Sequence, residues 1–150
     1  MIDRLVARIL PLDPNFALQL ELDARSGILS LSRVGETQDE LPYGLDLSAR
    51  VLLDFDSEWR LARLDLLIPA TRWQQGDFAA PAIEGQGTLA LNAMPTKRIS
   101  CPLPVTTLAA RHGLLLRWGP LEASSCVQLA PQVCALLAGS LWTGLYLQGV

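Results

Sequence analysis

The fold is decided by residues 45–69, which read LDLSARVLLDFDSEWRLARLDLLIP. Over residues 45–55 every second side chain is apolar, which is the period of a strand with one buried face. Residues 56–58 are polar, and the alternation resumes over 62–68. It stops at Pro69, because a proline has no N–H to donate to a sheet ladder. The stretch therefore predicts a β-hairpin whose arms are residues 45–55 and 62–68.

Composition places the chain among single-domain globular proteins. It has 150 residues, of which 50% are hydrophobic and 18% charged, enough apolar material to bury a core and exclude disorder. The 12 basic and 15 acidic residues give a net charge of -3 and form no block of one sign. Nucleic acid is therefore not expected as a partner, since phosphate binding needs a clustered basic face.

Hydropathy and cysteine usage indicate where the protein works. Mean hydropathy is +0.28, yet no uninterrupted apolar run reaches the roughly 20 residues that a membrane helix needs. Cys101, Cys126 and Cys134 show no CxxC spacing, which suits buried thiols in a reducing compartment. His112 is the single histidine. We expect a cytoplasmic protein of bacterial origin, with no membrane contact, no metal and no cofactor.

The rest of the chain shows short apolar segments punctuated by glycine and proline, which predicts a mainly β protein of antiparallel sheets or meanders with little helix. Residues 2–10 fit either a short helix or a strand. Residues 98–108 read as an extended edge segment, and 70–87 as a long connector with no sustained period. The remaining predicted strands cover residues 15–23, 28–34, 88–92, 113–118, 126–129, 132–137 and 141–147.

A faint internal repeat runs through these segments. The segments that align are 27–32 with 113–118, 45–53 with 127–135, and 63–66 with 144–147. One interpretation is a duplicated β unit, with halves 1–69 and 88–150 in a single domain of residues 1–150. The other is that any two leucine-rich hairpins align this well, because a period of two carries little information per residue.

The run VLLDFDSEWRLARLDL at residues 51–66 is similar to the end of a family of small bacterial β domains of unknown function. In that family an apolar strand leads into Asp-x-Asp, an acidic-Gly turn, Arg, two apolar residues, Gly, Ile, Glu and an apolar residue. Trp59 stands where the family prefers the first glycine, Arg63 replaces the second, and Gly144 restores it in the later repeat. The resemblance implies a fold but no activity. The matching positions are Asp54, Asp56, Glu58, Arg60, Leu61, Leu64 and Asp65.

Four residues are candidates for a binding site. Asp54 and Asp56 lie two apart, so that in a strand they share a face and would be able to share a metal or a proton; the alternative is a solvated hairpin face. Trp59 at the predicted hairpin tip and Trp73 in the connector are candidate interface residues, since exposed aromatic side chains are enriched there. For both tryptophans the alternative is that they fold back onto the core.

No nucleophile, base and oxyanion donor can be assembled from the sequence, so no catalytic residue is predicted. Cys134 or Cys101 with His112 lacks an acidic orienting group, and buried thiols are the better interpretation. We therefore expect a non-enzymatic protein that binds another protein, with two candidate roles: a toxin-neutralising immunity protein or a self-associating subunit. The competing prediction is a small-ligand-binding or enzymatic β barrel whose site forms only in three dimensions.

Overall fold

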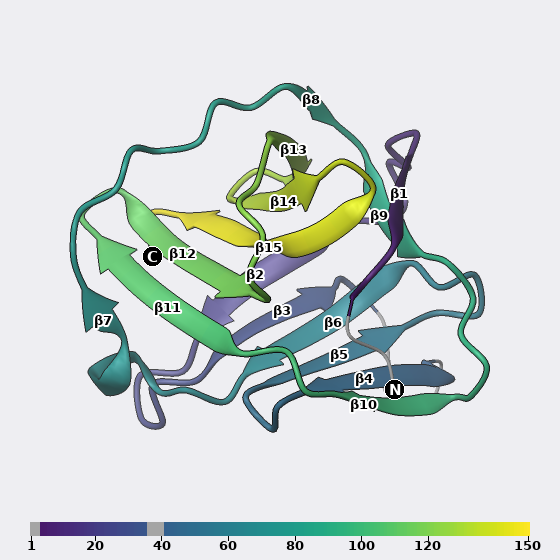
Figure 1. Cartoon of the computed structure of the whole chain (residues 1–150), viewed down its shortest axis with the longest axis horizontal. Coiled ribbons are helices and arrows are strands. Elements are labelled where there is room, and N and C mark those ends of the chain that lie inside the picture. The colour runs from purple at the N-terminus through teal and green to yellow at the C-terminus, as the bar shows by residue number, and fades with distance from the viewer. Residues whose placement is uncertain (1–3, 36–40) are drawn as a thin grey trace.

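The computed structural model describes residues 4–35 and 41–150. Two large sheets pack face to face, and a short two-stranded ribbon lies along one side (Figure 1). A single 3-10 turn (Ala70–Arg72) is the one helical element among the described residues. The prediction of a mainly β chain with antiparallel sheets and little helix is confirmed.

The first sheet is six-stranded, in the order β10-β4-β5-β6-β3-β2. Its neighbours are antiparallel except for β10, which runs parallel to β4. Its strands are β2 (Leu18–Leu22), β3 (Leu29–Arg33), β4 (Tyr43–Leu47), β5 (Val51–Phe55), β6 (Leu61–Leu66) and β10 (Arg98–Cys101).

The second sheet is seven-stranded, in the order β7-β11-β12-β15-β14-β13-β8. The two outer strands, β7 and β8, are two residues long and parallel to their neighbours. Its strands are β7 (Gln74–Gln75), β8 (Gly85–Gln86), β11 (Val105–Ala110), β12 (Gly113–Trp118), β13 (Ser125–Ala130), β14 (Val133–Ala138) and β15 (Leu141–Gln148).

The ribbon of β1 (Ala7–Leu10) and β9 (Thr88–Leu91) connects the two sheets. Val6 bridges to Leu141 at the start of β15, and Ala90 bridges to Arg60 just before β6. The sequence of segment 2–10 fitted either a helix or a strand. In the structure its residues 7–10 form a strand.

One core lies between the sheets and takes side chains from both. At its centre the Trp118 and Trp142 rings meet edge to face with centroids 4.8 Å apart. Each indole N–H has a backbone acceptor, Trp142 O for Trp118 and Gly144 O for Trp142, both at 2.8 Å. Burying these rings therefore leaves no indole donor unpaired.

The prediction of one strand over residues 45–55 is wrong. The chain turns back at Ser48 and Ala49, whose φ angles are 52° and 56°, and Arg50 N–H donates to Leu47 O at 2.9 Å. Positive φ at both central positions marks a type I′ turn, which usually carries Asn or Gly. Leu47 pairs with Val51, an even separation, so the apolar alternation continues in phase through the turn and hides it.

The two sheets share a strand order. When β2, β3, β4, β5 and β6 are matched to β11, β12, β13, β14 and β15, the neighbours are the same in both sheets. The hairpin registers also agree with the aligned segments of the repeat: Leu45 pairs with Leu53, and Val127 pairs with Ala135.

One part of that alignment is displaced. Leu31 pairs with Leu64, as Leu116 pairs with Leu145. The sequence alignment set Leu31 against Arg117, one residue too far along. Leu31 and Leu116 both point into the core and are fully buried. The buried face of the strand therefore decides the register, and the positions of Gly27 and Gly113 do not.

Candidate functional site

The two predicted aspartates serve separate ion pairs. Asp54 Oδ1 lies 2.7 Å from Arg98 Nη1. Asp56 Oδ1 accepts the backbone N–H groups of Glu58 and Arg60, while Asp56 Oδ2 accepts from Arg60 Nε at 2.7 Å. Asp56 therefore organises the hairpin turn, a common use of aspartate. A shared metal or proton is not indicated, because each carboxylate has its own arginine.

Both predicted interface tryptophans have folded back onto the protein. Trp59 is 6% exposed and stacks on Tyr43 with ring centroids 4.2 Å apart. Trp73 is 8% exposed, and its indole N–H donates to Ile68 O at 2.9 Å. The structure thus matches the core alternative for both side chains, and a binding surface has to be sought elsewhere.

The outer face of the six-stranded sheet carries a polar groove of about 410 Å³. Four of the five charged side chains among its described lining residues form ion pairs, Asp54 with Arg98 and Asp65 with Arg63 at 3.4 Å. The fifth, Asp46, accepts the Ala49 N–H at 2.7 Å. Ser30 also donates to Asp65 at 2.8 Å. Each of these charged side chains therefore already has a partner within the protein, and none is available to pair with a charged ligand.

A cluster of thiol, phenol and imidazole lies on the outer face of the second sheet. Cys126, Cys134 and Tyr146 are buried together against Phe78 from the connector. The cluster was not predictable from spacing, because Cys126 and Cys134 meet diagonally across β13 and β14. His112 Nε2 lies 2.7 Å from Phe78 O and donates to it, and Nδ1 lies 2.8 Å from the Tyr146 hydroxyl oxygen. Among the described residues no three His, Cys, Asp or Glu side chains converge as metal ligands.

The two thiols share a hydrogen bond. Cys126 donates this bond to Cys134. Donation, together with burial, raises the pKa of Cys126, and accepting the bond lowers the pKa of Cys134. We predict that Cys126→Ala will raise the pKa of Cys134, whereas Cys126→Ser, which keeps an O–H donor, will leave it low. Thiolate absorbance followed against pH measures this; identical titrations of Cys134 in the two variants would contradict the assignment.

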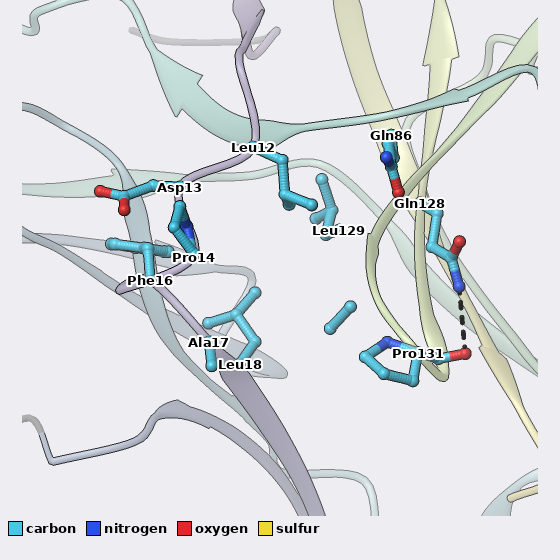
Figure 2. Close-up of a pocket in the computed structure, with 11 residues that line it drawn as sticks. Leu12, Asp13, Pro14, Phe16, Ala17, Leu18, Gln86, Gln128, Leu129 and Pro131 are labelled. Atoms are coloured by element: carbon cyan, nitrogen blue, oxygen red, sulfur yellow. Dashed lines mark hydrogen bonds between the residues drawn. The ribbon is translucent and has the colours of Figure 1, made fainter.

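An open, largely apolar cavity lies where an edge of the first sheet meets an edge of the second. We call it the edge cleft. It has a volume of about 420 Å³ and is lined by Leu12, Asp13, Pro14, Phe16, Ala17, Leu18, Gln86, Gln128, Leu129, Ala130 and Pro131. These residues come from the loop before β2, from β2, from β8, and from the β13–β14 hairpin (Figure 2). No sequence signal marked the site, since its parts lie far apart in the chain.

The two amide side chains that line the edge cleft lie on one side of it. Figure 2 shows the Gln86 and Gln128 amides on the side opposite Pro14 and Leu18, and the Asp13 carboxylate directed away from the cleft. Asp13 Oδ2 lies 3.6 Å from Arg60 Nη1.

The Asp56 turn supports the far wall of the cleft. Arg60 and Arg33, both within salt-bridge distance of Asp56, lie over the Phe16 ring at 4.8 and 4.3 Å. Phe16 is itself buried. The predicted Asp56 thus contributes to the cleft by positioning its wall, without contacting its interior.

Fold and cavities together define a class: a two-sheet antiparallel β protein with an open cleft at one edge. No helix of the described residues is long and apolar enough to cross a membrane. No protein-family model and no curated protein sequence matches this chain.

Proposed function

We propose that this chain is a non-enzymatic protein-binding protein that associates with a second copy of itself through strand β2. The observation that carries the proposal is the free hydrogen-bonding edge of β2. This strand ends the six-stranded sheet, and no described strand lies beyond it.

The ladder shows which groups are free. Ala17 O accepts from Val34 N–H, and Asp23 N–H donates to Ile28 O. In an antiparallel pair alternate residues face the neighbour, so Leu18, Leu20 and Leu22 direct their N–H and C=O groups outward. Such an edge is a ready template for another strand.

The side chains of β2 suit a two-fold pairing. With Leu20 opposite Leu20 of the second copy, Leu18 faces Leu22 of that copy, so all three leucines join one apolar row. Glu21 then faces Gln19 of the second copy, and like charges do not oppose each other. Leu22 is already 46% exposed. A symmetric pair of this kind is the commonest arrangement of homodimers.

The strand order shared by the two sheets also favours the edge of β2 as the interface. We propose that the shared strand order reflects duplication, which makes β2 the counterpart of β11. The outer edge of β11 is covered by β7, where Leu108 pairs with Gln74 and Ala109 with Gln75. The corresponding edges of β4 and β13 are covered by β10 and β8. Of these four edges, β2 is the one without a described neighbour.

Sedimentation velocity over a concentration series tests the proposal. We expect the wild type to shift from monomer to dimer as concentration rises, and Leu22→Lys to weaken dimerisation roughly tenfold or more, since a lysine would be desolvated against a leucine row. The matched control is Leu121→Lys, the same change at another leucine that is 46% exposed. It should behave like the wild type.

If both lysine variants dimerise as the wild type does, β2 is not the interface. If the wild type stays monomeric at all concentrations, a strand from a different protein, including a toxin, becomes the alternative occupant. The three cysteines are buried and form no disulfide, which supports the proposed reducing, cytoplasmic location.

A further inference from the structure

We propose that the edge cleft binds a small neutral molecule with an apolar body and one hydrogen-bond-donating head. The cleft adjoins the edge proposed for self-association, because Leu18 of β2 lines it, but the inference does not rest on that association. Four features of the cleft define the molecule: its size, its apolar walls, its lack of a free charge, and the position of its two amides.

Size comes from the volume. At about 420 Å³, the cleft falls within the roughly 300–1,000 Å³ typical of small-molecule sites. An apolar cavity of about 150 Å³ holds benzene, which has six non-hydrogen atoms, so on the same scale the cleft admits a body of about 17 non-hydrogen atoms. It is too small for a folded partner and wide enough for a fused aromatic ring or a medium-length alkyl chain.

The walls are apolar and partly wet in the free protein. Leu12 is 47% exposed, whereas Leu129 is 5% exposed and belongs to the main core. A ligand seated in the cleft would cover Leu12 and extend the core outward. Removing that apolar surface from water supplies the driving force for binding.

The cleft is electrically neutral toward its interior. Asp13 is the one charged side chain among the described lining residues; its Oδ1 accepts from the Asn15 N–H at 2.9 Å, and its Oδ2 faces Arg60. An anionic or cationic ligand would therefore lose its hydration without gaining a counter-charge. This selects against fatty-acid carboxylates and amines.

The amides set the head group. Gln128 Nε2 donates to Pro131 O at 3.2 Å, which leaves Gln128 Oε1 as an acceptor (Figure 2). Gln86 lies on the same side of the cleft and is exposed. A hydroxyl or N–H head would donate to these carbonyl oxygens, and the apolar body would lie toward Leu18.

A matched pair of fluorescent probes tests this inference. N-phenylnaphthylamine is neutral, apolar and carries one N–H; anilinonaphthalene sulfonate has the same rings and a charge. We expect saturable one-site binding of the neutral probe to the full chain, and at least tenfold weaker binding of the sulfonate. The titration is run on the Leu22→Lys variant as well, so that failure of self-association and failure of the cleft are distinguishable.

Two substitutions locate the site. Ala130→Phe fills the cleft and should weaken binding of the neutral probe at least tenfold, while Ala110→Phe, at another half-buried strand end outside the cleft, should leave it within about twofold. Gln86→Leu should weaken it about three- to tenfold by removing an acceptor. Circular dichroism checks that each variant is folded. Binding that is unchanged in Ala130→Phe and Gln86→Leu, or equal affinity for the sulfonate, would overturn the proposal.

Discussion

Replacing Gly144 by alanine should lower the free energy of unfolding by about 3 kcal/mol, near the upper end of the overpacking range. A Cβ at this position would overlap the carbonyl oxygen of Leu116 and come within 3.0 Å of Arg117 Cα. Both are backbone atoms of β12, the strand that pairs with β15. They cannot move aside without disturbing the ladder at the centre of the second sheet.

Thermal unfolding measures the effect. At roughly 2–4 °C per kcal/mol for a chain of this size, Tm should fall by about 6–12 °C. Gly85→Ala is the control, since nothing lies within 4 Å of a Cβ there. That variant should unfold within about 2 °C of the wild type, as surface substitutions usually do. A Gly144 variant as stable as the Gly85 one would show that β12 and β15 do not approach as closely as described.

Removing the Trp59 side chain should cost about 3–5 kcal/mol, the usual cost of a large buried aromatic residue, and glycine should be tolerated better than alanine. Trp59 loses its contacts with Tyr43 and Phe55 in both variants. Its φ angle, however, is 61°, a conformation that costs an L-residue roughly 1–2 kcal/mol and glycine little. Trp59→Gly should therefore be more stable than Trp59→Ala by about 1 kcal/mol.

Trp73 provides the matched comparison. It is buried to a similar extent, but its φ is -66°, where glycine only adds freedom to the unfolded chain. Trp73→Gly should be less stable than Trp73→Ala by about 0.5–1 kcal/mol. Urea unfolding of the four variants decides the matter: the order of alanine and glycine should reverse between the two sites, and the same order at both would refute the conformational argument.

Position 59 also shows what the sequence could and could not predict. The resemblance to small bacterial β domains set glycine at this position, and the positive φ explains why a glycine suits it. The resemblance itself stays a prediction. Exposure was judged from position in the hairpin, but a turn residue with positive φ can direct its side chain back across the strands, which is what brings Trp59 onto Tyr43.

The alternation of apolar and polar residues predicted most strands, because a strand with one buried face needs an apolar side chain at every second position. Gly113–Trp118 is a strand as expected, and most of the other predicted strands differ only at their ends. The prediction of one extended segment over 98–108 is wrong, because the chain passes there from β10 of the first sheet to β11 of the second, and the connector 70–87 contains the short strands β7 and β8. The pattern could not reveal the turn at Ser48 and Ala49, since the spacing across it is even and neither residue is a usual turn former.

The candidate site lay beyond sequence reasoning for a different reason. The edge cleft joins Leu12, Gln86 and Pro131, and no local signal fixes which strand ends of two sheets meet. The same holds for Cys126 and Cys134, which adjoin only because of the register of β13 and β14. Of the predicted residues, Asp56 alone is connected to the cleft, through Arg33, Arg60 and Phe16.

The pairing of β10 with β4 and of β1 with β9 bears on how the protein is made. Both β9 and β10 come from the chain beyond the connector, yet they complete structure begun by the earlier residues. During synthesis the first sheet must wait for residue 101 before the edge of β4 is covered, and the ribbon must wait for residue 91. Such long-range pairings make folding slow and leave strand edges open meanwhile. Although the two halves are similar, the first half therefore cannot complete its strand pairing until part of the second has been synthesised. A nascent chain is most open to mispairing before that point.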